Sequence, residues 1–372
     1  MLTVDNRIKE RIFGLDLLRA LAIFFVVFGH GAFFFTTNVY IQNIFNYIIF
    51  DGVSIFFVLS GFLIGNILIS DLKENNLSFA AILRFWKRRW LRTIPAYYSV
   101  LTIVIIISKI NSLDIPNNIL LYYLFSQNIV YGHPNFFNEA WSLSIEEWFY
   151  LILPISILIK SIILKSAIKT VFLTTTISII IAVILIRIYR FIHFPTNIIS
   201  NWDTYFRKIV ILRLDSIAFG VLGAYIAVYY KIFFYKFRRL LLITGIILLI
   251  ADKFIMIYDQ ELFGKFYLCV CSFLTNSLGT LLLVPYLTTF KTNFKQLHKL
   301  ITFTAEISYS LYLTNYTLVI MIIMPGLFNF SQKYDTTLGT QTYYFIMYIA
   351  VTFLLSVILN KTIEKPFMKL RN

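Results

Sequence analysis

The sequence predicts an all-α polytopic membrane protein with about ten transmembrane helices plus a short interfacial or re-entrant helix near 119–132. Of its 372 residues, 59% are hydrophobic and only 14% are charged, whereas soluble domains are about 25% charged. Several apolar runs exceed the roughly 18 residues that mark a spanning helix. Basic residues gather between these runs, as they do in cytoplasmic loops. One helical bundle accounts for this length, so we expect a single domain over residues 1–372.

The individual spans are marked by apolar runs that end at polar or charged residues. The run "ILLYYLFSQNIVYG" has only about a dozen apolar-leaning residues, too few at 1.5 Å per residue to cross about 30 Å of hydrocarbon. We therefore interpret it as the interfacial or re-entrant helix. The predicted spans lie near residues 14–35, 46–69, 94–110, 141–159, 171–188, 209–230, 240–257, 266–288, 303–325 and 341–360.

The charge distribution predicts the orientation of this bundle. With a cytoplasmic N-terminus and ten crossings, the segments that face the cytoplasm hold most of the 33 Lys and Arg residues. Counting 119–132 as a full span would place "KSIILKSAIK" (160–169) outside, against the positive-inside bias. Both termini are therefore predicted to be cytoplasmic. The net charge of +15 follows from the same bias, and no long soluble segment exists to bind nucleic acid.

The first span carries two ionisable residues, Arg19 and His30, in "LDLLRALAIFFVVFGHG" (15–31). Eleven helical steps place both on one face, about 16 Å apart along the axis. Arg19 lies near the cytoplasmic boundary, where its side chain can extend to the membrane surface. His30 lies in the outer half of the bilayer, where an ionisable group marks function or a buried pair.

Other predicted spans supply polar groups at a similar depth. Asp51 opens "DGVSIFFVLSGFLIG", Glu146 lies in "WSLSIEEWFY", and "RLDSIAFG" contributes Arg213 and Asp215. We expect His30, Glu146 and Asp215 to converge in the outer half of the bundle; a structural ion pair between Arg213 and Asp215 is the alternative for those two. A carboxylate can fix the tautomer of an imidazole and raise its basicity. A general base for a hydroxyl nucleophile requires both.

Two further stretches have a physical interpretation. In "RFWKRRWLRTIP" (84–95), Arg89 and Arg92 are three residues apart and share one helical face. Their guanidinium groups suit phosphate oxygens, and an anionic lipid headgroup is the alternative ligand. In "SGFLIG" (60–65), Gly61 and Gly65 are four residues apart and predict close helix packing.

In order along the chain, these motifs resemble the acyltransferase 3 family of bacterial integral-membrane acyltransferases, which includes surface polysaccharide O-acetyltransferases. Arg19 and His30 are similar to its Arg-x10-His pattern. The stretch "RRWLRTIPAYY" resembles its Arg-x-x-Arg element, and "WSLSIEEWFYLILP" resembles its Ser-Leu-x-x-Glu element with Ser142 and Glu146. "GVSIFFVLSGFLI" (52–64), "RLDSIAFG", "ISYSLYL" (307–313) and "IEKPF" (363–367) resemble further family elements. Two positions depart from the pattern: Trp148, where Gln is frequent, and Asn315, where many members have His.

The resemblance implies transfer of an acyl group, commonly acetyl from cytoplasmic acetyl-CoA, to a hydroxyl of a cell-surface or lipid-linked carbohydrate. It implies that His30 is catalytic, either as a general base or as a transient acyl carrier, with Glu146 orienting it. It places Arg19, Arg89 and Arg92 near CoA. We further expect supporting or substrate-binding roles for Ser142, from the matched motif, and for Asp51, Arg213 and Asp215, from their position in the predicted spans.

The resemblance also sets expectations about partners. We expect no metal and no permanently bound cofactor, with acyl-CoA as co-substrate, in the bacterial cytoplasmic membrane. Some family members carry a C-terminal soluble esterase-like domain, and we expect none here; this chain either modifies its acceptor directly or passes acyl groups to a separate extracytoplasmic partner. The alternative function is a transporter or exporter of a polar solute or polysaccharide, because buried ionisable groups also line transport pathways.

Overall fold

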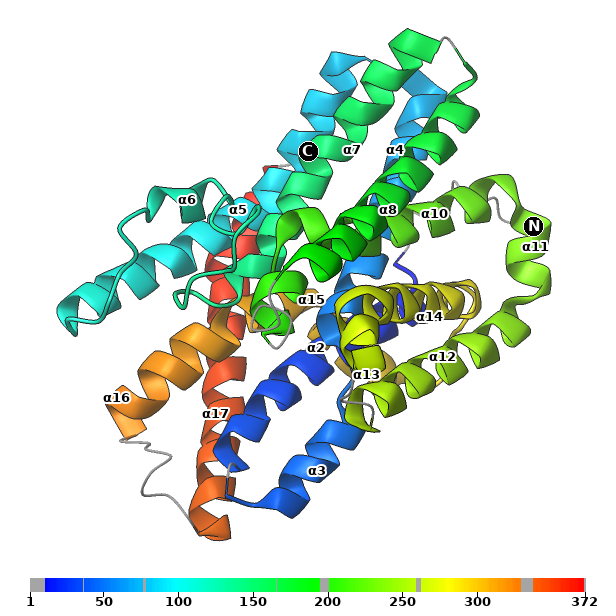
Figure 1. Cartoon of the computed structure of the whole chain (residues 1–372). Coiled ribbons are helices and arrows are strands. Elements are labelled where there is room, and N and C mark those ends of the chain that lie inside the picture. The colour runs from blue at the N-terminus through cyan, green and yellow to red at the C-terminus, as the bar shows by residue number, and fades with distance from the viewer. Residues whose placement is uncertain are drawn as a thin grey trace.

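The computed structural model describes residues 11–35, 37–75, 78–164, 166–194, 201–258, 262–328 and 337–370, and all regular structure within these ranges is helical (Figure 1). The first ten residues and the last two lie outside the described residues, so the side of the membrane on which the termini lie stays a prediction. Because a bilayer offers no hydrogen-bonding partners, helices that satisfy their own backbone groups are the expected solution for such an apolar chain.

The 3₁₀ segment η1 and the π segments η4, η5 and η6 directly follow an α-helix, whereas the π segment η2 and the 3₁₀ segment η3 lie in the connection before α10. In chain order the elements are α2 (Phe13–Gly31), η1 (Ala32–Phe35), α3 (Val39–Ile48), α4 (Gly52–Asn75), α5 (Phe79–Ile110), α6 (Leu120–Tyr123), α7 (Ala140–Leu164), α8 (Ile168–His193), η2 (Asp203–Arg207), η3 (Val210–Leu212), α10 (Leu214–Tyr229), α11 (Lys231–Lys236), α12 (Arg238–Tyr258), α13 (Leu262–Phe266), η4 (Tyr267–Cys271), α14 (Ser272–Leu287), α15 (Lys295–Thr314), η5 (Asn315–Ile323), α16 (Met324–Phe328), α17 (Leu338–Leu359), η6 (Asn360–Glu364) and α18 (Lys365–Lys369).

Nine helices within the described ranges are long and apolar enough to cross a membrane. The predicted span over 209–230 is the tenth. It forms the helix α10, which begins only at Leu214 and has 16 residues, or about 24 Å at 1.5 Å per residue. The chain before α10 forms the short segments η2 and η3 instead. The structure therefore supports nine spans by length, with α10 as a shorter apolar helix.

The second correction concerns α5, which is much longer than the predicted span over 94–110. It runs for 32 residues from Phe79, so the basic stretch 84–95 is helical and continuous with the membrane helix. Pro95 lies inside this helix. The hydroxyl oxygen of Ser78 caps its start by accepting a hydrogen bond from the amide of Ala81 at 3.2 Å. This bond satisfies one of the backbone N–H groups that have no partner inside the helix at its N-terminus.

The third correction concerns 119–132, where the expected helix is reduced to the single turn α6. The following residues form turns that hydrogen-bond to neighbouring helices. Tyr97 of α5 donates to the carbonyl of Tyr122, and Trp148 of α7 donates to the carbonyl of Phe125, both at 2.9 Å. These side-chain donors replace the backbone bonds that a longer helix would have formed.

The predicted close packing at Gly61 and Gly65 is confirmed. A Cβ atom on Gly61 would lie 1.9 Å from the carbonyl oxygen of Ile217 on α10, and one on Gly65 would lie 2.8 Å from Cβ of Ala224. On the partner helix α10, a Cβ on Gly220 would lie 2.0 Å from the carbonyl oxygen of Val58 of α4. The backbones of α4 and α10 thus meet along a seam of small residues, as membrane helices do.

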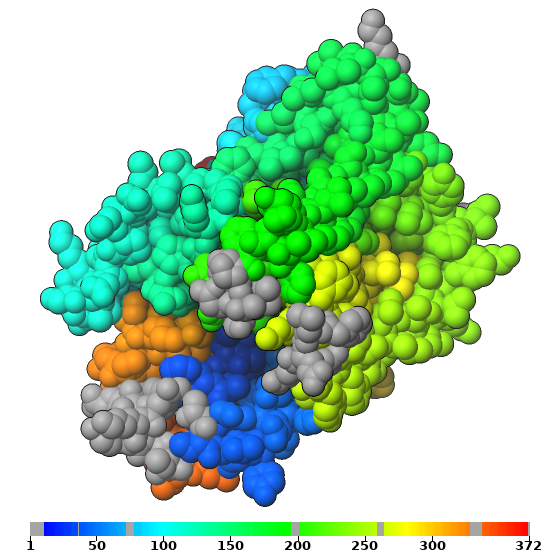
Figure 2. Space-filling model, in the orientation of Figure 1, coloured from blue at the N-terminus to red at the C-terminus, as the bar shows by residue number. Residues whose placement is uncertain are grey.

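Helix α2 packs against several other helices on one side and leaves Leu21 and Phe24 exposed on the other. Helix α2 contacts α4, α14 and α15, while α12 packs on α14 (Figure 1). In the space-filling view, blue side chains of the N-terminal helices are set back between the green and yellow segments near the centre of the visible face (Figure 2). The C-terminal end of α2, which carries His30, is therefore surrounded by several elements.

Candidate active site

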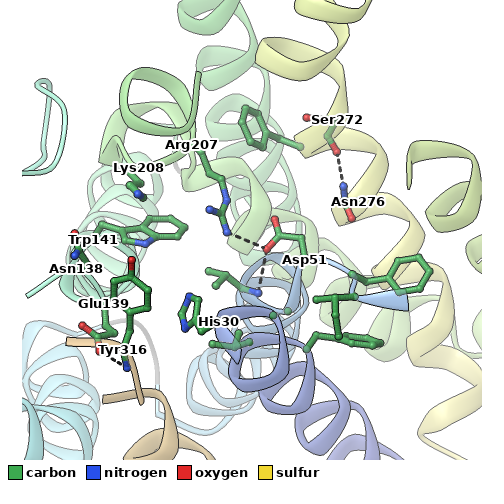
Figure 3. Close-up of a pocket in the computed structure, with 18 of the residues that line it drawn as sticks. His30, Asp51, Asn138, Glu139, Trp141, Arg207, Lys208, Ser272, Asn276 and Tyr316 are labelled. Carbon is green, nitrogen blue, oxygen red and sulfur yellow. Dashed lines mark hydrogen bonds and ion pairs between the residues drawn. The ribbon is translucent and has the colours of Figure 1, made fainter. Parts of the chain in front are cut away.

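A cavity of about 520 Å³ lies beside the C-terminal end of α2. We call it the histidine cavity, because the imidazole of His30 forms part of its wall (Figure 3). Its other walls come from the start of α4, the loop before α7, the segment η2, and the helices α12, α14 and α15 with η5. The lining side chains that carry a polar group are His30, Asp51, Asn135, Asn138, Glu139, Trp141, Trp202, Arg207, Lys208, Asp252, Lys253, Ser272, Asn276, Tyr312 and Tyr316.

Asn315 fixes the tautomer of His30. The Nδ2 amide group of Asn315 donates to the carbonyls of Leu311 and Tyr312, at 2.9 and 2.7 Å. Its Oδ1 is therefore oriented as an acceptor. Nδ1 of His30 lies 2.5 Å from this oxygen and must donate its hydrogen there. The neutral imidazole then carries its lone pair on Nε2, which makes no hydrogen bond to any described residue and is available as a base.

Glu139 holds the segment that carries Asn315. Its Oε1 accepts hydrogen bonds from the amides of Tyr316 and Thr317, at 3.0 and 2.7 Å, and its Oε2 accepts from the hydroxyl of Thr317. These amides lie at the start of η5, where the change from α- to π-helical winding leaves them available. Burial raises the pKa of Glu139 to about 7, although these hydrogen bonds act in the opposite direction.

Asp51 caps α4 and also faces the cavity. Its Oδ1 accepts from the amides of Val53 and Ser54 at 3.1 and 3.3 Å, and its Oδ2 accepts from the hydroxyl of Ser54 at 2.7 Å. Arg207 of η2 approaches the same carboxylate, with Nη2 3.5 Å from Oδ1 (Figure 3). The side chain predicted to support the site thus fixes the start of α4 and anchors an arginine that the sequence analysis did not select.

The alternative that Arg213 pairs with Asp215 is wrong. The carboxylate of Asp215 instead accepts from both Nη groups of Arg187, at 2.5 and 3.3 Å, and neither side chain is exposed. Side chains two residues apart at a helix start do not face each other. Arg213 donates to the hydroxyl of Ser54 at 2.8 Å and lies 4.1 Å from the ring centroid of Phe273. Neither Arg213 nor Asp215 lines the histidine cavity.

A second, smaller pocket of about 70 Å³ collects the three arginines predicted to bind CoA, and we call it the arginine pocket. Arg19 of α2 and both Arg89 and Arg92 of α5 line it, and among the described residues that line it Glu146 is the one carboxylate. Arg19 and His30 share the helix α2, yet they line different cavities, as their separation along the axis predicts.

Glu146 contacts the arginine pocket rather than His30, which corrects the hypothesis that it orients the imidazole. Its carboxylate accepts from Tyr150 at 2.7 Å and from Ser60 at 3.1 Å, and it lies 3.8 Å from Nη2 of Arg89. Arg89 also donates to the hydroxyl of Tyr150. Glu146 therefore positions a guanidinium group, while Asn315 takes the place expected for a carboxylate beside His30.

Tyr312 lies between the two cavities and lines both, as does Val53. The hydroxyl of Tyr312 lies 2.5 Å from that of Ser142, and Tyr312 also donates to the carbonyl of Glu139 at 3.3 Å. Ser142, which was predicted to support the site, is thus part of the partition between the arginine pocket and the histidine cavity.

Several site residues were missed from the sequence. Asp252 is an ionisable residue inside an apolar run, a signal that was available in the sequence. Asn315 was noted only as a departure from a family pattern, and Glu139 lies just before the stretch that carried Glu146. Arg207 gave no signal, because it lies in a polar connection. Within the described ranges, no cluster of three or more His, Cys, Asp or Glu side chains could hold a metal ion.

Comparisons with known proteins identify relatives of the chain. A family model described as an acyltransferase domain matches residues 12–361. The peptidoglycan O-acetyltransferase OatA of Listeria monocytogenes is 34% identical over 160 residues, which cover 39% of this chain and 24% of that protein. The O-acetyltransferase OatA of Staphylococcus aureus (strain NCTC 8325) is 26% identical over 381 residues, covering 96% of this chain and 57% of that protein.

The staphylococcal match thus covers nearly all of this chain and little more than half of that relative. No solved structure matches the chain.

Proposed function

The chain belongs to the acyltransferase 3 family of integral-membrane acyltransferases, and from this premise we propose that it is a membrane O-acetyltransferase. It moves an acetyl group from acetyl-CoA to a hydroxyl of a cell-surface or lipid-linked carbohydrate, with peptidoglycan as the acceptor suggested by the name of the Listeria relative. The single observation that carries the proposal is His30, whose tautomer is fixed by Asn315 at the wall of a large cavity.

The donor side of this proposal is the arginine pocket. Among the described residues that line it are three arginines and one carboxylate, Glu146, and guanidinium groups suit the phosphates of a CoA molecule. Glu146 and Tyr150 hold Arg89 in place. The pocket is small, and CoA would extend from it to the cytoplasmic surface, with only the acyl end reaching toward Tyr312.

The acceptor side is the histidine cavity, where Nε2 of His30 acts as a base. It takes the proton of an acceptor hydroxyl while the hydroxyl oxygen attacks the thioester carbonyl. The carbon–sulfur bond then breaks, and the CoA thiolate leaves and takes up the proton from the imidazolium. A transient acyl group on Nε2 is the second route open to the same residue. In both routes His30 needs the lone pair that Asn315 keeps on Nε2.

The test compares His30→Ala with His193→Ala, because His193 is exposed at the end of α8 and lines neither cavity. The variants are reconstituted in proteoliposomes and supplied with acetyl-CoA and peptidoglycan fragments, and acetyl ester is measured by mass spectrometry. Loss of a general base costs about 10² to 10⁴ in rate, so we expect H30A to lose transfer and H193A to retain it. Equal rates in the two variants would remove His30 from the mechanism.

The same preparation separates transfer from transport. An exporter would move solute across the bilayer without consuming acetyl-CoA, whereas an acetyltransferase releases one CoA thiol for each ester formed. Thiol release that follows ester formation supports the proposal, and solute flux without thiol release contradicts it.

A further inference from the structure

The wall of the histidine cavity opposite His30 contains polar groups that the proposed reaction does not use. Asp252 of α12 and both Ser272 and Asn276 of α14 line the cavity, although all three are at most 7% exposed; Figure 3 shows Ser272 and Asn276 on this wall. Beyond its two initial arginines, α12 has only Asp252 and Lys253 as charged residues. Polar groups inside membrane helices are costly and mark ligand pathways.

The carboxylate of Asp252 is held by neutral donors only. Its Oδ1 accepts from the hydroxyl of Tyr267 at 2.8 Å, and its Oδ2 accepts from Nδ2 of Asn276 at 2.5 Å. Among the described residues, no cation forms an ion pair with it; the neighbouring Lys253 donates to the carbonyl of Ile49 at 2.6 Å. Each carboxylate oxygen keeps a second lone pair, which a hydroxyl entering the cavity can use.

Asn276 adds an acceptor to this wall. Its Nδ2 group donates both hydrogens, one to Asp252 and one to the carbonyl of Ser272 at 3.1 Å. The amide oxygen Oδ1 is thereby left as the part of Asn276 that can accept from a ligand. Tyr267 does not line the cavity, so it supports Asp252 from behind.

The charges of the cavity select against an anionic occupant. Three cations line it, namely Arg207, Lys208 and Lys253, and three carboxylates oppose them, namely Asp51, Glu139 and Asp252. Outside the cavity wall, Asp203 also lies 2.8 Å from Arg207 and 2.5 Å from Lys208. Burial alone would raise the pKa of Asp203, but these two cations outweigh it and lower that pKa. Counted with Asp203, four carboxylates stand against three cations, so the cavity has no excess of positive charge to favour a phosphate.

We propose that Asp252 and Asn276 form an acceptor subsite that binds the hydroxyl groups of a neutral pyranose sugar across the cavity from His30. Hydroxyl donors match the acceptor oxygens of both side chains, and Trp141 and Trp202 supply the aromatic surfaces that complete the cavity wall. The cavity of about 520 Å³ has the size of a small-ligand site. The inference rests on the proposed function and specifies the chemistry of its acceptor.

Binding is measured without acetyl-CoA, so that the result does not depend on catalysis. The detergent-solubilised chain is titrated with N-acetylglucosamine and, separately, with N-acetylglucosamine 1-phosphate, while tryptophan fluorescence is followed. The two sugars differ only in the charged group. We expect the neutral sugar to bind more tightly than the phosphorylated one, and His193→Ala, whose side chain lines neither cavity, to bind it as the unmodified chain does.

Asp252→Asn and Tyr267→Phe form the matched pair of variants. Both break the same hydrogen bond network, but only Asp252 faces the cavity. A hydrogen bond to a charged group contributes about 1.5 to 3 kcal/mol, so we expect D252N to weaken sugar binding about tenfold or more and Y267F to change it little. Asn276→Ala, which we expect to weaken binding as well, serves as the second variant if D252N does not fold.

Tighter binding of the phosphorylated sugar, equal weakening in D252N and Y267F, or no response to the neutral sugar would overturn the subsite. Failure of the proposed function gives a different result: sugar binding with the expected pattern, but no acetyl transfer when donor is added.

Discussion

At the scale of single residues, the interpretation depends on which nitrogen of His30 carries the hydrogen. Asn315 settles this, because both hydrogens of its amide are already donated to the backbone of α15. The orientation of one amide group therefore leaves Nε2 of His30 as the base. In this arrangement the neutral amide of Asn315 orients the imidazole, which the sequence analysis expected of the carboxylate of Glu146. Glu146 instead lies beside Arg89.

Asn315 can be tested by its acceptor oxygen. Asn315→Leu removes the partner of Nδ1, and loss of such an orienting contact costs about 10- to 100-fold where it has been measured for ligating histidines. We expect that loss in kcat for acetyl transfer, whereas Asn315→Asp, which keeps the oxygen, should restore most of the rate. The KM for acetyl-CoA should stay unchanged in both. Equal rates in the Leu and Asp variants would show that Asn315 only fills space.

The raised pKa of Glu139 predicts how the stability of the protein depends on pH. Its pKa is about 7 in the folded chain and 4.5 ordinarily, so the folded state binds more protons between these values. Its contribution to stability is present below pH 4.5 and is lost as the pH rises through 7. We expect Glu139→Gln to remove this loss, so that the difference in melting temperature between variant and unmodified chain changes from pH 5 to pH 8. A constant difference would contradict the pKa shift.

At the scale of helices, composition and periodicity located nine of the ten predicted spans, because length and apolarity determine which segments can cross a bilayer; the tenth, 209–230, forms the shorter helix α10. The predicted ends of these helices were less accurate than their positions along the chain. The start of α5 was placed 15 residues too late, since Lys and Arg between apolar runs were interpreted as a loop, although a basic helix can extend beyond the membrane surface. The turns after α6 depend on side chains from α5 and α7, which no local pattern encodes.

The close contact of glycines between α4 and α10 predicts that a larger residue there destabilises the protein. Gly61→Ala would bring Cβ to 1.9 Å from the carbonyl of Ile217, so the helices must separate, at a cost of about 1 to 3 kcal/mol. Gly339→Ala is the control, because a Cβ there has nothing within 4 Å. We expect thermal unfolding to shift to lower temperature only in G61A. Matching melting temperatures would mean that the seam tolerates a methyl group.

At the scale of the whole molecule, two cavities meet at Tyr312. Helical spacing predicted that Arg19 and His30 lie at different depths on one face of the first span, whereas the placement of Arg89 and Arg92 with Arg19 came from the family resemblance. The sequence did not predict that Glu146 belongs with the arginines, or that α12 and α14 complete the second cavity. Those facts depend on how the helices pack, and single-residue patterns contain little information on packing between distant helices.

The central claim is that the arginine pocket takes the donor and the histidine cavity carries out the transfer. The most direct measurement is the steady-state rate of acetyl transfer against acetyl-CoA concentration for the unmodified chain, Arg89→Met and His30→Ala. We expect R89M to raise the KM for acetyl-CoA about tenfold or more, from the loss of a charge-assisted contact. His30→Ala should lower kcat about a hundredfold or more with that KM unchanged. If both variants change the same kinetic parameter, or if H30A transfers acetyl at the unmodified rate, the division of roles between the two cavities is wrong.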